Sequence, residues 1–428
     1  MPALGALIAE PLFLLTDTAM VGHLGAEPLA GLGLASAILQ TIIGLMVFLA
    51  YATTPAVARR LGAGDERGAV EAGIDGLWLA LGLGAVLALA GWGAAPWLVG
   101  AFGASEEVTA EASAYLSISM AGLPAMLIVF AATGLLRGLQ DTRTPLWVAG
   151  LGFGANIVLN FVFIYVVGLG LAGSATGTVI AQWAMVLVYL IVVARHAARV
   201  GANPRPHRAG LRRGAASGGW LFLRTVSLRA ALLLATWSAT ALGPDELAAY
   251  QVAITLFFTL AFALDALAIA AQALVGRSLG AGDVATVRAV LKRCVLWGVG
   301  SGAVLGAAIA ASAWVLPGVF TSSAEVAALL PPALVALGIS APLAGLVFVL
   351  DGVLIGAGDA RYLAWTGLVN LAAYVPLALG VVWWSGTLPA SVALALVTAA
   401  FAIGYLVARA VTLSLRARGA RWMVTGTV

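Results

Sequence analysis

The most informative pattern along this chain is a series of long apolar runs separated by short polar breaks. Crossing the hydrocarbon core of a bilayer takes about 20 helical residues, and every run reaches that length. The runs predict twelve helices, over residues 2–21, 29–54, 72–99, 112–136, 145–167, 170–194, 220–242, 247–275, 288–316, 327–355, 362–384 and 389–414. We therefore expect an all-α polytopic membrane protein.

Composition supports the same fold class. Of the 428 residues, 62% are apolar and only 9% are charged, whereas an ordinary soluble domain carries about a quarter charged residues. The basic residues behind the formal net charge of +4 are scattered singly, so we expect the lipid bilayer and no nucleic acid as a partner. The single cysteine, Cys294, excludes an internal disulfide framework and a cysteine-built metal site.

The basic residues also predict an orientation. All but two of the 22 Lys and Arg residues lie on the side where even-numbered predicted helices end, and the other two, Arg224 and Arg229, enter the seventh helix from that side. The loops on the opposite side carry acidic residues and no basic ones. By the positive-inside rule, both termini are cytoplasmic. We expect a multi-pass protein of a bacterial-type inner (plasma) membrane.

The chain begins inside its first predicted span. No basic residues precede this span, and Glu10 and Asp17 interrupt it, which is unlike a signal peptide. We expect a genuine first helix and a natural start further upstream. Pro11, beside these acids, either kinks this helix or is a tolerated membrane proline.

The second half of the chain repeats the first. Residues 61–65 (LGAGD) recur at 279–283, and residues 133–143 align with 351–361, both at an offset of 218 residues. A repeat of six helices keeps the same membrane orientation, so the two copies form parallel lobes. We expect an N-terminal lobe over 1–194, a cytoplasmic linker over 195–219, a C-terminal lobe over 220–414 and a cytoplasmic tail over 415–428.

Polar side chains inside predicted spans are the candidate functional residues, because ionisable groups in hydrocarbon are costly. By topology, the outer half of the first lobe collects Asp17 and Glu10 of the first helix, Tyr115 of the fourth, Asn156 and Asn160 of the fifth, and Thr178 of the sixth. A carboxylate in such a dry pocket could take up and release a proton. We predict Asp17 and Glu10 for proton coupling and the other four for the pocket, although neutral polar residues also serve only to hold helices together.

The second lobe does not repeat this cluster, since Ala235 stands where the repeat would place the counterpart of Asp17. Its own acids are Asp265 and Asp351, of which Asp351 lies close enough to the inner end to reach the cytoplasm. Arg224 and Arg229 are possible partners for these acids, or Arg224 extends to the membrane surface.

Several motifs are missing. The sequence has no G-x-x-x-x-G-K-[ST] phosphate loop, so we expect no ATP hydrolysis. His23, His196 and His207 fall in predicted loops without metal-ligand spacing. We therefore expect neither an enzyme, nor a metal site, nor an organic cofactor.

Three segments resemble one transporter family. They are residues 16–24 (TDTAMVGHL), 137–145 (RGLQDTRTP) and 156–160 (NIVLN). Together they resemble the multidrug and toxic compound extrusion (MATE) family, in its DNA-damage-inducible F (DinF) branch, and the resemblance covers essentially the whole chain. It implies a twelve-helix, two-lobed antiporter that exports amphipathic, often cationic compounds in exchange for protons or sodium.

The resemblance also implies roles for individual residues. The acid matching Asp17 carries the coupling proton in that branch, and residues matching Tyr115, Asn156, Asn160 and Thr178 line the same pocket. Pro2 matches a proline at which helix one bends. Three features depart from the family: Asn160 stands where the branch usually has aspartate, the seventh helix has arginines and no glutamate, and the short cytoplasmic lead is missing.

We therefore predict a monomeric secondary antiporter that works by alternating access, with Asp17 protonated from outside and deprotonated inside. Its predicted substrates are amphipathic cations, drugs or toxic metabolites, and its coupling ion is the proton, with sodium as the alternative. A lipid-linked precursor flippase of the same superfamily is a rival; its pyrophosphate needs a cation-lined cavity, for which Arg224 and Arg229 are the candidates. A membrane-embedded enzyme lacks a metal cluster or nucleophile–base pair, and a non-transporting relic is the remaining alternative.

Overall fold

The computed structural model describes residues 16–427, and this part of the chain is helical with no β-strand. It contains ten helices that are long and apolar enough to span a membrane, and a bent helix pair makes an eleventh. This confirms the predicted all-α membrane fold. The first predicted span, 2–21, lies mostly outside the described residues, of which 16–22 are helical.

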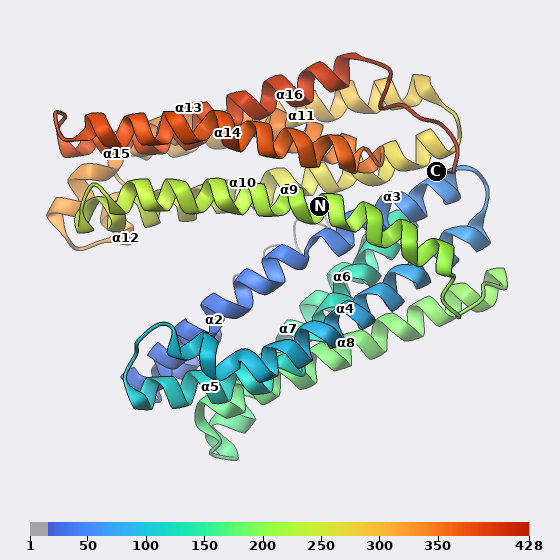
Figure 1. Ribbon diagram of the computed structural model, residues 1–428, viewed down its shortest axis with the longest axis horizontal. Helices are drawn as coiled ribbons and strands as arrows, with labels where there is room; N and C mark the ends of the chain where they lie inside the picture. Colours follow the sequence, from blue (N-terminus) through green and yellow to red (C-terminus); the bar gives the residue numbers. More distant parts are fainter. Residues whose placement is uncertain (1–15, 428) are drawn as a thin grey trace. The chain divides into compact units, whose positions relative to one another are not determined.

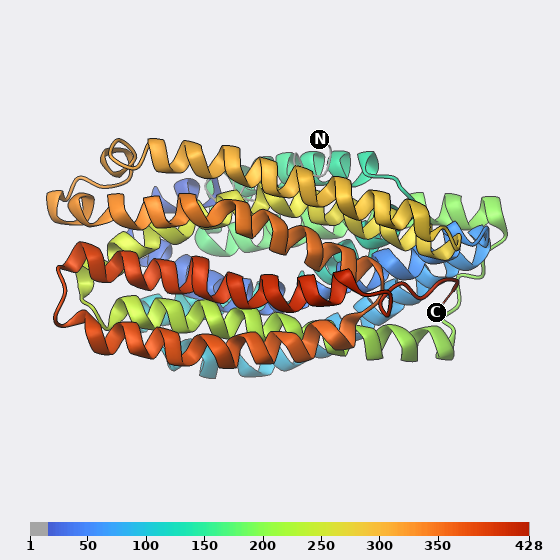
Figure 2. The same cartoon turned by 90° about the horizontal axis from the view of Figure 1, so that it is seen from above.

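The chain divides into two compact units between Gly218 and Gly219. The first contains α2 (Ala26–Met46), α3 (Phe48–Gly62), α4 (Glu66–Gly100), α5 (Glu106–Met120), α6 (Leu123–Gly138), α7 (Arg143–Phe161), a π-helical turn (Val162–Val166) and α8 (Gly170–Val200). The division falls within α9 (Arg208–Thr240). The second unit continues with α10 (Pro244–Gly280), α11 (Val284–Ala311), α12 (Pro317–Phe320), α13 (Ala324–Gly356), α14 (Ala360–Ser385), α15 (Ala390–Ala399), a π-helical turn (Ala400–Tyr405) and α16 (Leu406–Arg418). In both views its long helices run side by side with their axes roughly aligned (Figures 1 and 2).

Helix bounds repeat with the offset found in the sequence. The continuous span Ala26–Gly62 and helix α10 (Pro244–Gly280) begin and end 218 residues apart. The same offset relates the α5–α6 pair to α13, at both ends. Each unit is thus a copy of one helical arrangement, as the internal repeat predicts.

Close helix contacts repeat as well. A Cβ on Gly134 would lie 2.7 Å from the backbone oxygen of Ala50, and one on Gly352 would lie 2.5 Å from that of Ala268. Both residues of the second pair stand 218 positions after those of the first. Only glycine allows backbones to approach this closely. The two units therefore share packing contacts in addition to helix order.

The repeated LGAGD segment forms the same turn twice. Gly64 has φ 80° and its counterpart Gly282 has φ 74°, in the left-handed region that favours glycine. Asp65 and Asp283 then cap α4 and α11, each accepting a hydrogen bond from the backbone N–H three residues later, at 2.8 and 2.9 Å. Such caps satisfy donors that the helix itself cannot.

The structure differs from the sequence prediction in one span of the first unit. The predicted helix 112–136 is two helices, α5 and α6, whose axes are bent by 48° at a short break. Gly122 lies in the break, and Pro124 stands in the first turn of α6, where its missing N–H leaves no bond unmade. The bend lies directly beside the cavity described below.

The predicted linker, 195–219, is mostly helical, because α8 runs to Val200 and α9 begins at Arg208. The connection between these helices is held on α4. Asp75 accepts a hydrogen bond from the backbone N–H of His207 at 2.7 Å, and Glu71 accepts one from that of Asn203 at 3.1 Å. The seven connecting residues are thus fixed against the first unit.

The C-terminal segment packs on the second unit. Helix α16 extends into the predicted tail as far as Arg418. Trp422 beyond it is only 1% exposed, and the backbone N–H of Gly426 donates to the oxygen of Leu279 at 3.0 Å. The predicted tail, 415–428, therefore begins as a helix and continues as a packed segment over its described residues.

Candidate functional site

Asp17 lies at the meeting point of three helical segments in the first unit. Its side chain is 4% exposed. Asn160 of α7 donates a hydrogen bond from Nδ2 to Asp17 Oδ1 at 2.7 Å, and Ser174 of α8 donates one from Oγ to the same oxygen at 2.6 Å. The first helical segment is thereby tied to the fifth and sixth predicted spans through a single carboxylate oxygen.

The two hydrogen bonds and the burial of Asp17 have opposite effects on the stability of its charged form. Removing a carboxylate from water disfavours its charged form, whereas donors aimed at it favour that form. A hydrogen bond to a charged group contributes about 1.5–3 kcal/mol. Among the described residues that line the adjoining cavity there is no Lys or Arg. The carboxylate therefore has hydrogen-bond donors beside it but no protein cation in the cavity lining.

The cavity beside Asp17 has about 120 Å³ of free space. Of the sequence-predicted residues, Asp17, Tyr115, Asn156 and Thr178 line it, while Asn160 is 1% exposed and lies behind Asp17. The structure thus brings together all the predicted first-lobe residues that it describes. Glu10, Pro2 and Pro11 lie outside the described residues.

The cavity is also lined by polar residues that the sequence pattern did not single out. They are Thr18, Ser36, Gln40, Ser119 and Gln182. Most follow a four-residue spacing, which places side chains on one face of a helix. Ser36 and Gln40 are so spaced on α2, and Ser174 and Gln182 flank Thr178 at that spacing on α8. Ser174 lies one helical turn before the predicted residue Thr178, so a search for polar residues at that spacing would have found it.

Three buried oxygens at this site have no hydrogen-bond partner among the described residues. They are Asn156 Oδ1, Asn160 Oδ1 and Thr178 Oγ1. Buried polar atoms in native proteins nearly always have a partner, whether protein, water or ligand. These atoms therefore mark places where a bound cation, water or substrate group could complete the site.

The remaining walls of the cavity are apolar. They include Leu32, Leu39, Ile43, Leu123, Met126, Phe153 and Met185. Methionine side chains adapt to differently shaped ligands, and concave sites with mostly apolar walls and a few polar groups are typical of small-molecule binding. The cavity thus offers an acidic end and an adaptable apolar surface.

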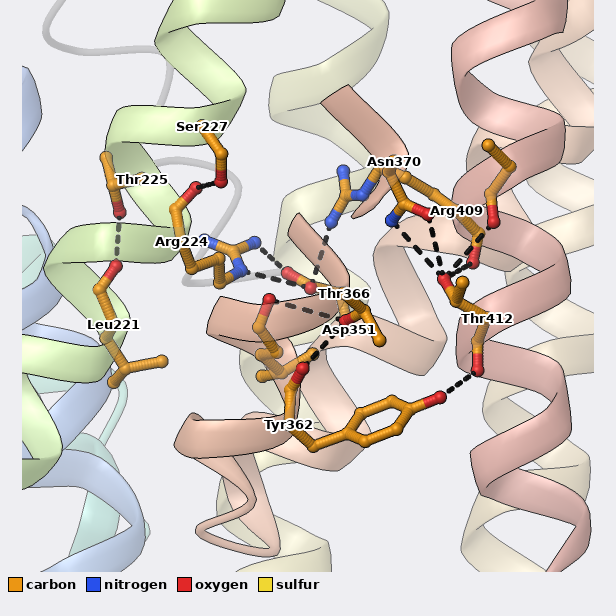
Figure 3. A network of polar contacts seen from close by, with 12 residues as sticks. Leu221, Arg224, Thr225, Ser227, Asp351, Tyr362, Thr366, Asn370, Arg409 and Thr412 are labelled. Atoms are coloured by element: carbon orange, nitrogen blue, oxygen red, sulfur yellow. Dashed lines mark hydrogen bonds and ion pairs between the residues drawn. The ribbon is translucent and has the colours of Figure 1, made fainter. Parts of the chain in front are cut away.

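The second unit contains a different cluster, in which Asp351 pairs with two arginines (Figure 3). Arg224 of α9 donates from Nε to Asp351 Oδ1 at 3.1 Å and from Nη2 to Oδ2, and Arg409 of α16 donates from Nη2 to Oδ1 at 2.9 Å. All three residues are less than 9% exposed. The alternatives in which Asp351 or Arg224 simply reaches water are therefore wrong, because each is buried in an ion pair.

The other charged residues predicted for this lobe lie elsewhere. Arg409, grouped in the sequence with cytoplasmic cations, is a buried member of the cluster. Arg229 is exposed and belongs to no ion pair among residues 16–427, and Asp265 is half-buried on α10. Across those same residues, no group of three His, Cys, Asp or Glu side chains could hold a metal ion.

Comparison with known proteins gives consistent matches. The MatE family model matches residues 2–162 and 225–384. Protein DETOXIFICATION 44, chloroplastic, of Arabidopsis thaliana is 30% identical over 381 residues, which cover 86% of this chain and 73% of that protein. DNA damage-inducible protein F of Escherichia coli (strain K12) is 31% identical over 288 residues, covering 66% of this chain and 63% of that protein.

Solved structures show the same fold. A Vibrio cholerae MATE transporter, VcmN, superposes with a TM-score of 0.88 at 22% identity, over 99% of this chain and 96% of that one. An outward-facing multidrug resistance MATE family transporter of the MOP superfamily gives a TM-score of 0.85 at 25% identity, over 97% of this chain and 93% of that one.

Proposed function

The chain belongs to the multidrug and toxic compound extrusion (MATE) family of efflux transporters, and from this premise we propose that it is a proton-coupled antiporter for amphipathic cations. The observation that carries the proposal is the buried Asp17 carboxylate, the one charged group among the described residues that line a mostly apolar cavity. A cation attracted by this carboxylate and a proton bound to it compete for the same negative charge. Exchange follows when the two faces of the membrane favour different occupants.

Asn160 sets how many protons this site can carry. Its amide donates to Asp17 at 2.7 Å whatever the pH, whereas an aspartate at this position would donate only when protonated. Among the described cavity-lining residues, Asp17 is the one with a carboxylate. We therefore assign one coupling proton per cycle to the described part of this site.

Sodium is the alternative coupling ion, and one observation favours it. Asn156 Oδ1, Asn160 Oδ1 and Thr178 Oγ1 are buried without partners in the described part of the chain, close to a carboxylate-bearing cavity. Hard cations prefer such oxygen ligands. A sodium ion among these atoms would compete with the cationic substrate in the same way as a proton.

The flippase alternative lacks comparable support. A pyrophosphate requires a roomy, cation-lined cavity, but Arg224 is engaged with Asp351, and the space beside that pair is about 10 Å³. The distribution of basic residues supports cytoplasmic termini. A single chain contains the whole described site, which supports a monomer as the transporting unit.

The test is uptake of a fluorescent lipophilic cation into proteoliposomes that contain the purified protein, driven by either a proton or a sodium gradient. We expect the proton gradient to drive uptake and Asp17→Asn to reduce it to the level of empty liposomes. Asp65→Asn is the matched control, because an amide can also cap a helix. Uptake driven only by sodium would replace the proton with sodium, and equal proton-driven uptake by Asp17→Asn and wild type would overturn the mechanism.

A further inference from the structure

An exposed arginine and tryptophan stand at the same place in each copy of the repeat. Arg143 and Trp147 lie in the first turns of α7, and Arg361 and Trp365 lie in those of α14, 218 residues later. All four side chains are exposed. The pair is therefore a feature of the repeat and is not confined to one unit.

Each pair continues along its helix as an exposed apolar stripe. Leu151 follows Trp147 and Val369 follows Trp365, each after four residues, a spacing that keeps side chains on one helix face. The exposed fractions are 66% and 69% for Trp147 and Leu151, and 54% and 57% for Trp365 and Val369. Only 22% of the most apolar stretch of either helix is buried inside the protein. In a membrane protein, such a stripe faces the lipid chains.

The two arginines carry charges that no acid of the described chain neutralises, since neither belongs to an ion pair among residues 16–427. The acids nearest in sequence are engaged elsewhere. Asp141 accepts hydrogen bonds from the backbone N–H groups of Arg143 and Thr144, both at 3.0 Å, and Asp359 pairs with Arg416 at 2.6 Å. Each guanidinium group is thus available to an anion outside the protein.

The arginine of the second unit also contacts an aromatic ring. The guanidinium carbon of Arg361 lies 5.8 Å from the ring centroid of Trp220 on α9. A cation at this distance is attracted by the face of the ring. The contact holds the guanidinium group close to α9 without neutralising its charge.

We propose that each pair binds one anionic phospholipid, with the headgroup phosphate on the arginine and an acyl chain along the tryptophan and the aliphatic residue that follows it. A helix rises 1.5 Å per residue, so the tryptophan lies about 6 Å beyond the arginine. This is the depth at which a headgroup gives way to hydrocarbon, where tryptophan is enriched. Arginine matches the geometry of a phosphate group through paired N–H donors.

The charge of the surface favours an anionic lipid over a zwitterionic one. Both helices begin on the side of the protein that carries the basic residues. Basic side chains at a membrane surface attract lipids with a net negative charge, whereas a zwitterionic headgroup has no net charge to contribute. The inference does not depend on the coupling ion or on the substrate of the transporter.

The test is native mass spectrometry of the purified protein, titrated in detergent with phosphatidylglycerol or with phosphatidylcholine of the same acyl chains. We expect wild type to bind phosphatidylglycerol more tightly. Arg143→Gln and Arg361→Gln should each weaken the binding of one phosphatidylglycerol by about fivefold, the usual contribution of one cation near an anionic surface. Arg361→Lys keeps the charge and should retain the preference for phosphatidylglycerol.

Two further variants separate a charge-specific site from general contact with lipid. Arg199→Gln is the matched control, because this exposed arginine of α8 lies on the same side of the protein and is followed four residues later by Asn203 in place of a tryptophan. It should bind both lipids like wild type. Trp365→Ala should weaken the binding of both lipids alike, because the ring contacts the chain. Equal affinity of wild type for the two lipids, or the same phosphatidylglycerol affinity in Arg143→Gln, Arg361→Gln and Arg199→Gln, would overturn the proposal.

Discussion

Asn160 donates a hydrogen bond to the Asp17 carboxylate across 2.7 Å, from a position where the related branch usually has a second acid. Two carboxyl groups at this distance cannot both be ionised, and they share a proton. The amide of Asn160 keeps the hydrogen bond to Asp17 but cannot take up or release a proton as an aspartate would. The pair therefore preserves the geometry of the site while reducing the number of protons that it can bind.

Restoring the acid should change the coupling ratio. We expect Asn160→Asp to add a second proton per transport cycle, because the new carboxyl group must be protonated to donate to Asp17. The measurement is the membrane potential and pH gradient at which net substrate flux reverses in proteoliposomes. Asn203→Asp, in the connection between α8 and α9, introduces the same charge outside the cavity and should leave the ratio unchanged. An unchanged ratio in Asn160→Asp would contradict the one-proton assignment.

Ser174 should be necessary for efficient transport although it is a neutral residue. Ser174→Ala removes the 2.6 Å donor to Asp17, and we expect the affinity for the cationic substrate to fall about tenfold as the ionised carboxylate loses support. Direct binding of the fluorescent cation measures this change, and Ser174→Thr should restore it. Thr176→Ala is the control, since its hydroxyl bonds to the backbone of its own helix. Similar loss in both alanine variants would indicate a general packing effect.

The glycine contacts should be intolerant of even one methyl group. A Cβ on Gly352 would lie 2.5 Å from the backbone oxygen of Ala268 and 2.8 Å from its Cα, and backbone atoms cannot move aside cheaply. We expect Gly352→Ala to destabilise the second unit by about 1–3 kcal/mol, seen as a lower unfolding temperature in detergent. Gly300→Ala, on α11, meets nothing within 4 Å and should be neutral or slightly stabilising. Equal unfolding temperatures for the two variants would refute the contact.

The connection between α8 and α9 should become sensitive to protease when its anchor is removed. Asp75→Ala deletes the acceptor for the backbone N–H of His207, next to the start of α9, at a cost of about 1 kcal/mol by analogy with a lost helix cap. We expect faster trypsin cleavage after Arg208, measured by gel electrophoresis and mass spectrometry. The control variant, Glu66→Ala, changes the first turn of α4, the helix that carries Asp75. We expect trypsin to cut this variant at the wild-type rate.

Hydrophobic runs predict which segments enter the membrane, but they do not predict where a helix bends. The break between Met120 and Leu123 contains no polar residue, so the hydropathy of the sequence gives no sign that the helix ends there. Proline is also an insufficient signal. Pro124 stands at the break, whereas its repeat counterpart, Pro342, lies inside the continuous helix α13. The difference depends on packing around each helix, which a local pattern does not contain.

For the candidate site, a four-residue spacing and topology were sufficient to group Asp17 with Asn156 and Asn160. Ser174 escaped because a serine in a helix commonly bonds to its own backbone, so its presence does not indicate a role. Arg409 was misplaced for another reason. A cation near a predicted helix end normally reaches water, and only the packing of α13 against α16 shows that it meets Asp351.

The repeated glycine contacts show which properties a duplicated gene preserves. Each half inherits the same backbone approach at Gly134 or Gly352, yet Asp17 corresponds to Ala235, and Asp351 corresponds to Thr133. Ancestral helix packing constrains small residues at the crossings and leaves interior side chains free to diverge. This molecule accordingly holds a carboxylate with neutral hydrogen-bond donors in one half and a carboxylate between two guanidinium groups in the other, two different interiors built on a single inherited architecture.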